Sequence, residues 1–223
     1  MDLSIGCNEA SAPATPNGRP TVYIVDDDVS VRESLEGLIC EAGWQPAVFS
    51  SAQDFLSHHH TAGPCCLILD VSLPDLNGLE LQRQIGAERE DMPIIFITGY
   101  GDIPMSVHAI KAGALEFLTK PLGDEVLLNA VRDALQRSAL ALDVAADLQI
   151  LRDRYASLSG REREVLALVV IGLMNKQVAS ELGISEVTVK AHRGRMMQKM
   201  KARSLADLVN IASRLGIRRK SSG

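Results

Sequence analysis

Residues 65–70 read Cys-Cys-Leu-Ile-Leu-Asp, an apolar run without a charge until it ends on a carboxylate. Similar short apolar runs stand on both sides of it, at residues 21–25, 47–49, 94–97 and 115–118. Between the runs, apolar residues recur at helical spacing, as from Val31 to Leu38 ahead of Gly43. The same spacing predicts helices over 79–85 and 104–112. Strands that alternate with helices, and that are apolar throughout, are typical of a parallel sheet buried on both faces. The sequence therefore predicts an α/β domain with a flavodoxin-like, five-stranded sheet.

The C-terminal part carries helix signals without strands. Ser159 and Glu162 have the spacing of a capping box, and Gly172, Gly183 and Gly216 each end an apolar pattern of helical period. Four helices are predicted, with the glycine-containing turn between the second and the third, where Asn175 and Ser185 would begin helices. This arrangement is typical of an all-α helix-turn-helix domain.

Between Gly123 and Gly160 the chain has no glycine or proline, and most of this stretch is predicted as one long helix. Leu128, Leu135 and Leu142 lie seven residues apart. That spacing favours pairing with another helix and packing on the chain's own sheet equally. The predicted organisation is a disordered tail over 1–19, a sheet domain over 20–137, a linker helix over 138–156 and a helix-turn-helix domain over 157–219.

The balance of basic and acidic residues also changes near the start of the predicted helix-turn-helix domain. From Ser159 onward there are 13 Lys and Arg against 5 Asp and Glu, whereas the residues before it carry 10 against 23. A basic domain behind an acidic one predicts that only the second contacts a polyanion. No apolar stretch reaches the roughly 20 residues that cross a bilayer, and the polar N-terminus lacks the pattern of a signal peptide. Cys65 and Cys66 are expected to be buried thiols, and the protein is expected to be cytoplasmic.

Polar side chains follow four of the five predicted strands, at the edge of a parallel sheet where ligands bind. They are Asp26, Asp27 and Asp28, then Asp70, Thr98 and Lys120. Clustered carboxylates repel one another unless a hard cation neutralises them, and Mg²⁺ prefers oxygen ligands. A carboxylate beside such an ion, with an ammonium and a hydroxyl nearby, has the components of a phosphoacceptor site. Each residue alone is more simply a helix cap or a solvated charge; their joint placement at strand ends favours the site.

Five separated motifs resemble the receiver domain of two-component response regulators. They match in order and spacing over about residues 20–137, at Val25–Asp28, Leu69–Pro74, Asn77–Gly78, Ile97–Gly101 and Leu118–Pro121. The resemblance implies that a sensor histidine kinase phosphorylates Asp70.

The same resemblance implies roles for the residues around Asp70. Asp27 and Asp70 would bind Mg²⁺ (or Mn²⁺) with the backbone carbonyl of Ser72, and Asp26 would hold a metal-bound water. The positions that bind the phosphoryl group or respond to it would be Thr98, Phe117, Lys120 and Pro121, with a cis bond between the last two. Phenylalanine stands at a switch position that is often tyrosine, so this chain has no hydroxyl there.

A second functional pattern is the run from Lys190 to Arg203, which holds six Lys and Arg residues, one histidine and no acid. A surface helix usually mixes charges of both signs. A helix of this composition suits the major groove of DNA, where Lys and Arg contact guanine edges and phosphates. The interspersed apolar residues recur at helical spacing and are expected to face the core; they are Val187, Val189, Met196, Met197 and Met200.

Residues 158–215 resemble the luxR-type helix-turn-helix of FixJ/NarL-family regulators. The matching pieces are residues 158–166, 172–179, 182–193 and 199–200. The resemblance implies contacts with DNA from Lys190 and Arg193, with Thr188, His192 and Arg195 nearby. Gly194 stands where relatives often carry a longer side chain that contacts DNA.

Together these features predict a phosphorylation-activated transcriptional regulator rather than an enzyme. Its expected partners are a sensor histidine kinase, promoter DNA, RNA polymerase and, after phosphorylation, a second copy of the chain. The alternative is a receiver-based module for protein–protein interaction that does not bind DNA; the basic helix argues against it. A third class, an enzyme, would be restricted to slow self-dephosphorylation of the receiver.

Overall fold

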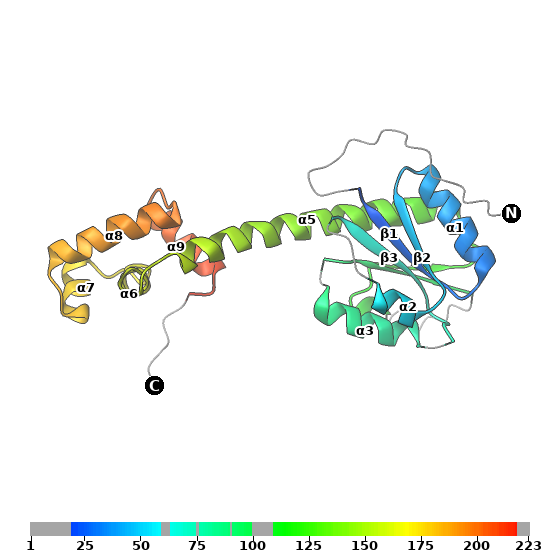
Figure 1. The fold of residues 1–223 in the computed structure, drawn as a ribbon, viewed down its shortest axis with the longest axis horizontal. Coiled ribbons are helices and arrows are strands. Elements are labelled where there is room, and N and C mark those ends of the chain that lie inside the picture. Colours follow the sequence, from blue (N-terminus) through cyan, green and yellow to red (C-terminus); the bar gives the residue numbers. More distant parts are fainter. Residues whose placement is uncertain (1–18, 59–62, 75, 90, 100–108, 218–223) are drawn as a thin grey trace. The chain divides into compact units, whose positions relative to one another are not determined.

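The N-terminal part of the computed structural model is a five-stranded parallel sheet with helices on both faces (Figure 1). The structure describes residues 19–58, 63–74, 76–89, 91–99 and 109–217. The elements of this part are β1 (Thr21–Val25), α1 (Val29–Glu41), β2 (Gln45–Phe49), α2 (Ala52–Ser57), β3 (Cys65–Asp70), α3 (Gly78–Glu88), β4 (Ile94–Thr98), β5 (Glu116–Thr119) and the beginning of α5 (Asp124–Ala156). The predicted fold class is confirmed. The helix predicted over 104–112 lies mostly outside the described residues.

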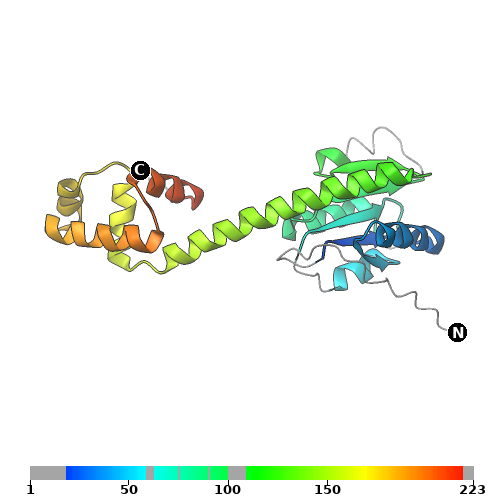
Figure 2. The ribbon, with the colours of Figure 1, turned by 90° about the horizontal axis from the view of Figure 1, so that it is seen from above.

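Two apolar layers hold the sheet between its helices. Tyr23 and Val25 of β1 point into a core shared with α2 and α3, where the Tyr23 ring centroid lies 5.6 Å from that of Phe55. Val22 and Ile24 point into the opposite core, which α1 and α5 cover (Figure 2). Because both faces are covered, β1, β3 and β4 are buried along their whole length, as their continuous apolar sequences predict.

The order of the strands places a crevice between β1 and β3. The sheet runs β2-β1-β3-β4-β5, so the chain leaves β1 toward one edge and, after β2, returns to the other side of β1. Loops leave the carboxyl ends of β1 and β3 in opposite directions at such a switch point, and ligands bind there in open α/β sheets. Asp26 follows β1 and Asp70 ends β3, so the fold brings these two carboxylates to the crevice.

Helix α5 is continuous from Asp124 to Ala156, which confirms the long helix expected between Gly123 and Gly160. Leu128 and Leu135 pack against the core of the sheet domain, so two of the three regularly spaced leucines contact the chain's own sheet. The chain divides into two compact units between Asp143 and Val144, within this helix. No helix in the described part of the chain combines the length and apolarity needed to span a membrane.

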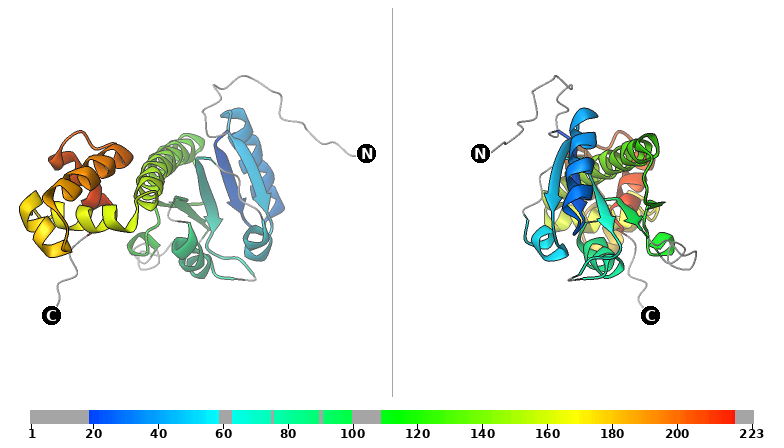
Figure 3. Two further views of the ribbon diagram at one scale, coloured as in Figure 1. Left: turned by 60° about the vertical axis from the view of Figure 1, so that its left-hand side comes forward. Right: turned by 90° about the vertical axis from the view of Figure 1, so that its right-hand side faces the viewer.

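The C-terminal unit is helical (Figure 3). Its elements after α5 are α6 (Gly160–Val169), α7 (Asn175–Leu182), α8 (Glu186–Met200) and α9 (Leu205–Arg214). Gly183 ends α7 with a left-handed φ of 64°, a conformation that favours glycine. Met174 rather than Asn175 occupies the N-cap position of α7, which corrects the sequence prediction. The side chain of Asn175 instead accepts a hydrogen bond from α8.

A partly buried ion pair joins α6 to α8. Glu162 is only 2% exposed, and its Oε2 accepts hydrogen bonds from the Ser159 N–H (2.9 Å) and from Lys199 Nζ (2.7 Å). Ser159 Oγ accepts in return from the Glu162 N–H, which completes the predicted capping box. The hydrogen bonds from Lys199 and Ser159 lower the pKa of Glu162 below its ordinary value. Lys199 therefore ties α8 to the start of α6.

Glu162→Gln is expected to lower the free energy of unfolding of the C-terminal unit by about 1.5–3 kcal/mol near neutral pH, the range for hydrogen bonds to a charged group. Because folding lowers the pKa of Glu162, the stabilisation is present above its ordinary value of 4.5 and is lost as the pH falls through the folded value. Urea unfolding of the full chain across this pH range measures the effect. Glu164→Gln, at an exposed ion pair with Arg161, is the control and should change little. If both variants lost the same free energy of unfolding at every pH, the stabilising role of the Glu162 carboxylate would be contradicted.

Candidate functional site

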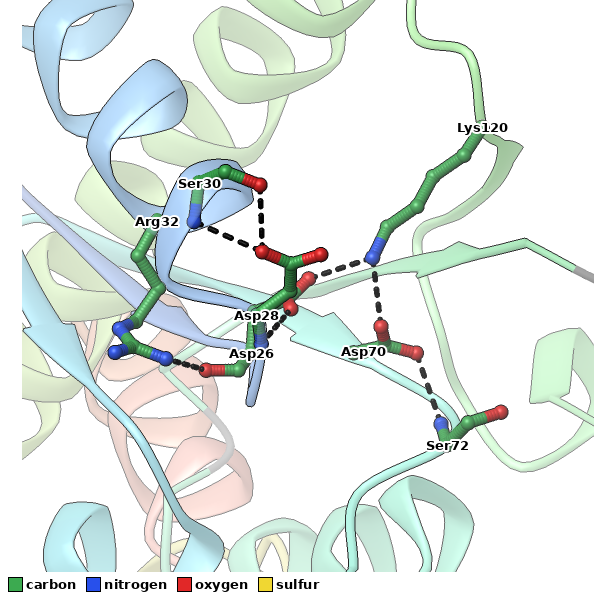
Figure 4. Close-up of polar contacts among 7 residues, drawn as sticks. All are labelled: Asp26, Asp28, Ser30, Arg32, Asp70, Ser72 and Lys120. Carbon is green, nitrogen blue, oxygen red and sulfur yellow. Dashed lines mark hydrogen bonds and ion pairs between the residues drawn. The ribbon is translucent and has the colours of Figure 1, made fainter.

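Three carboxylates meet where β1 and β3 end. Asp26 and Asp70 are buried, whereas Asp27 is exposed. One oxygen from each lies within 4.8 Å of the others. Backbone donors orient two of them: the Asp28 N–H donates to Asp26 Oδ1 (2.9 Å), and the Ser72 N–H donates to Asp70 Oδ1 (2.8 Å) (Figure 4). The acidic residues predicted from the strand ends therefore form one cluster.

Lys120 bridges the two buried carboxylates. Its Nζ donates to Asp26 Oδ2 and to Asp70 Oδ2, each at 2.7 Å (Figure 4). Residue 120 follows β5, and its N–H donates to the carbonyl of Thr98 at the end of β4 (2.8 Å). The peptide bond between Lys120 and Pro121 is cis, as the resemblance implied. The ends of β4 and β5 thus bring the ammonium group to the acidic cluster.

The charges of this cluster do not balance. Burial raises the pKa of Asp26, although the hydrogen bond from Lys120 opposes this change. Burial also acts to lower the pKa of Lys120, but its hydrogen bonds to Asp26 and Asp70 outweigh burial, so that pKa is raised. Ionised carboxylates at Asp26, Asp27 and Asp70 with one ammonium leave an excess of two negative charges. A hard divalent cation with oxygen ligands would balance the site, so its donor set fits Mg²⁺ or Mn²⁺.

The predicted switch residues lie on the two neighbouring strands. Thr98, the last residue of β4, is 1% exposed. Phe117 on β5 is half-buried and pairs in register with Phe96, whose ring centroid is 6.2 Å from its own. Thr98 pairs in register with Thr119, one residue before Lys120. The acidic cluster and the predicted switch residues therefore occupy adjoining strands.

Gly78 allows α3 to begin directly against the end of β3. Its N–H donates to the carbonyl of Val71 (3.2 Å). A Cβ at this position would lie 2.7 Å from the backbone oxygen of Asp70 and 3.1 Å from the Phe96 ring. No side chain fits without displacement of the backbone. The Asn77–Gly78 motif thus has a steric reason, since Asn77 caps α3 through its side chain and Gly78 permits the close approach.

Gly78→Ala is therefore expected to destabilise the sheet domain by about 1–3 kcal/mol, as overpacking does, and to slow phosphorylation because the backbone of Asp70 must move. Gly86→Ala on the same helix is the matched control. A Cβ at Gly86 meets nothing within 4 Å, so that change should be neutral or stabilise the helix by up to about 1 kcal/mol. Thermal unfolding and labelling by a small phosphodonor measure both effects. Equal behaviour of the two variants would contradict the steric explanation.

Two residues that the sequence analysis did not single out support the acidic cluster. Arg32 on α1 donates through Nη1 to the backbone carbonyl of Asp26 (2.7 Å). Ser30 donates through its N–H and its hydroxyl to Asp28 Oδ1, at 2.8 and 2.6 Å, so Asp28 caps α1 (Figure 4). The spacing from Asp28 to Ser30 was a visible capping signal. Arg32 gave none, since its contact depends on where α1 packs.

In the C-terminal unit, the basic residues of α8 divide into two groups. Arg193 is half-buried and donates through Nη1 to Asn175 Oδ1 on α7 (2.9 Å). Lys199 contacts Glu162, as described above, and His192 is half-buried with an Nδ1 that has no hydrogen-bond partner. Lys190 and Arg195 are exposed; Lys190 Nζ lies 3.6 Å from Glu186 one turn earlier. Exposed ion pairs of this kind contribute little to stability, so Lys190 can leave Glu186 and contact a polyanion.

Thr188 stands at the start of α8, within its N-terminal cap. Its N–H donates to Ser185 Oγ (3.1 Å), and the two hydroxyl oxygens lie 2.8 Å apart. Val189, Met196 and Met200 of α8 are fully buried, which confirms that these apolar residues face the core. The same prediction was wrong for Val187, which is 76% exposed. Among the five residues predicted to contact DNA, the structure leaves Thr188, Lys190 and Arg195 exposed, whereas His192 and Arg193 turn partly toward the protein.

Comparisons with known proteins agree with both halves of the structure. Residues 22–132 match the family described as response regulator receiver domain, and residues 156–212 match bacterial regulatory proteins of the luxR family. The chain is 45% identical over 212 residues to nodulation protein W of Bradyrhizobium diazoefficiens, an alignment that covers 95% of this chain and 91% of that protein. This chain belongs to the response-regulator family with a luxR-type DNA-binding domain.

Two further relatives support the same assignment. The response regulator is 39% identical to transcriptional regulatory protein FixJ of Bradyrhizobium diazoefficiens, over 88% of this chain and 96% of that protein. Its fold is similar to the solved structure of response regulator StyR, with a TM-score of 0.77 at 48% identity, covering 88% of this chain and 99% of that one. The protein is thus a two-component regulator of transcription, with a receiver domain and a DNA-binding domain, as its sequence predicted.

Proposed function

We propose that Asp70 is the residue that accepts the phosphoryl group and that a sensor histidine kinase in the cytoplasm is its donor. The observation that carries this assignment is the double hydrogen bond of Lys120, which joins Asp70 to Asp26 at the carboxyl edge of the sheet. Asp70 is the carboxylate at the centre of the cluster, held by the Ser72 N–H on one oxygen and by Lys120 on the other.

The chain's own groups account for the transfer. An oxygen of the Asp70 carboxylate attacks the phosphorus of a phosphohistidine, the bond from phosphorus to the imidazole nitrogen breaks, and that nitrogen keeps the electron pair. Lys120 then pairs with the phosphoryl oxygens, and the Thr98 hydroxyl donates to one of them. Asp26, Asp27, Asp70 and the Ser72 carbonyl are the residues that would hold Mg²⁺ or Mn²⁺. A bound ion of this kind supplies positive charge that offsets the charge of the phosphoryl oxygens.

A groove beside this site suits the approach of the donor. It encloses about 320 Å³ between α1 and the segment after β5, and Lys120 is one of its lining residues. Leu35 and Leu38 give it an apolar floor, and Ser30 and Ser34 give it polar atoms. Val29, next to Asp28, is 57% exposed. We propose that the kinase's phosphohistidine domain covers this groove, because a protein placed there reaches Asp70 without rearrangement of the sheet.

Phosphorylation acts on DNA binding through the switch residues, because Asp70 and α8 belong to different units. When the phosphoryl group draws Thr98 toward it, Phe117 on the next strand turns into the space vacated. Both movements change the surface that β5 and the start of α5 form. We propose that this surface pairs two chains, that the pair places two copies of α8 on half-sites about one helical turn apart, and that bound dimers engage RNA polymerase.

Thr98→Ala is expected to accept phosphate from acetyl phosphate but to dimerise poorly. The hydroxyl that responds to the phosphoryl group is removed, while Asp70 and Lys120 remain. Sedimentation velocity with and without acetyl phosphate and Mg²⁺ measures the dimer fraction, which should rise in the wild type. Ser57→Ala, which removes an exposed hydroxyl from α2, is the control and should behave as wild type. An unchanged mass in the phosphorylated wild type, with tightened DNA binding, would exclude dimerisation as the link.

A further inference from the structure

The most exposed large apolar side chain among the described residues lies on α8. Val187, the second residue of this helix, is 76% exposed. A single exposed valine needs no explanation by itself. Its place on the helix is informative, however, because the residues around it share one face of α8.

The buried side of α8 defines what faces outward. Val189, Met196 and Met200 are fully buried and mark the side that packs on the helical core. At about 100° per residue, the centre of the opposite side falls on Val187, Ala191, Gly194 and Gln198, all of which are exposed. Lys190 and Arg195 flank this centre on its two sides. Except for Gln198 near its C-terminal end, the middle of the outward face therefore consists of small or apolar residues, and a cation lies on each side of it.

Gly194 adds a second observation to this face. It sits inside a 15-residue helix, where glycine lowers helix stability. Neither packing nor backbone conformation requires it, because a Cβ there meets nothing within 4 Å and its φ is not in the left-handed region. A glycine at an exposed position of this kind allows another molecule to approach the helix backbone closely.

Together these features specify the chemistry of what the face contacts. The two flanking cations suit phosphates or guanine edges, whereas Val187 and Ala191 offer only methyl groups. In the major groove, the base atom that matches an apolar side chain is the C5-methyl group of thymine. Residues near the start of a recognition helix are those that reach base edges, and Val187 occupies such a position.

We infer that Val187, with Ala191 beside it, is a specificity-determining residue that reads a thymine methyl group in each half-site. The inference rests on the proposed placement of α8 in the major groove. The proposed contact of Val187 is separate from those predicted for Arg193 and His192, whose side chains turn partly toward the protein. Specific recognition by this face thus combines charge at its borders with methyl contact at its centre.

The test uses the full chain phosphorylated by acetyl phosphate. DNA duplexes are first selected from a random pool with wild-type protein. Each thymine of the selected site is then replaced singly by deoxyuridine, which lacks the methyl group, and the dissociation constant is measured by fluorescence anisotropy. The inference predicts that loss of the methyl at one thymine per half-site weakens wild-type binding by about fourfold, the effect of one buried methyl. Val187→Ala should bind thymine and uracil duplexes equally.

Val48→Ala, at an exposed valine of β2, should retain the full discrimination against uracil. The inference is overturned if every uracil duplex binds the wild type as tightly as its thymine parent while Lys190→Ala loses specific binding; α8 would then read DNA without Val187. It is also overturned if Val187→Ala discriminates as the wild type does. If no sequence is enriched from the pool, the proposed placement of α8 fails together with the inference.

Discussion

Asp70→Asn is expected to abolish phosphorylation of this response regulator by acetyl phosphate in the presence of Mg²⁺. The amide is nearly isosteric with the carboxylate, so the hydrogen bond from the Ser72 N–H is kept while the nucleophilic oxygen is lost. Asp26, the other carboxylate that Lys120 contacts, lies deeper than Asp70 and is fully buried. Removal of Mg²⁺ with a chelator should have the same effect on the wild type.

Mass spectrometry of the intact chain measures this loss, because each phosphoryl group adds a defined mass. Asp133→Asn, an exposed aspartate on α5, is the matched control and should be labelled as the wild type is. Labelling of Asp70→Asn at a similar rate, on any residue, would rule out Asp70 as the acceptor.

Lys190→Ala is expected to weaken specific DNA binding by about 1–3 kcal/mol if its side chain contacts a base, and to reduce the salt dependence by about one unit of slope if it contacts a phosphate. Its only described partner is the exposed Glu186 carboxylate at 3.6 Å, which DNA can replace at little cost. Any loss of DNA affinity in Arg193→Ala would have a second cause, because Arg193 also connects α8 to α7 through its hydrogen bond to Asn175.

Titration of a selected DNA duplex at several salt concentrations separates these effects. Arg83→Ala, which removes an exposed cation from α3 of the receiver domain, is the control and should leave both affinity and salt slope unchanged. A Lys190→Ala variant with wild-type affinity and slope would exclude this side chain from the interface.

The acidic site could be predicted because its geometry follows from topology. Once the strands are parallel, the residues after β1, β3 and β5 must meet at one edge, and Asp26, Asp70 and Lys120 do so within hydrogen-bond distance. The second strand was predicted to begin at residue 47, but it begins at Gln45. An edge strand tolerates a polar residue and Pro46 because one side of its backbone has no partner strand.

The basic helix was harder to interpret from the sequence, because charge alone does not say which side chains face outward. Arg193 and Lys199 read as DNA contacts or solvated charges, yet they pair with Asn175 and Glu162. Those partners are 18 and 37 residues away, so the pairing depends on how α6, α7 and α8 cross. Val187 was predicted wrongly for the opposite reason: an apolar residue at helical spacing predicts a core position, whereas in the structure this side chain is exposed.

We propose that phosphate on Asp70 controls binding of DNA by a separate unit of the same chain. The most direct measurement is the dissociation constant of a selected duplex for the wild type and for Asp70→Asn, each with and without acetyl phosphate and Mg²⁺. Phosphodonor should tighten binding by the wild type and leave Asp70→Asn unchanged. Equal affinity of the phosphorylated and unphosphorylated wild type, with phosphate confirmed on Asp70, would contradict the claim.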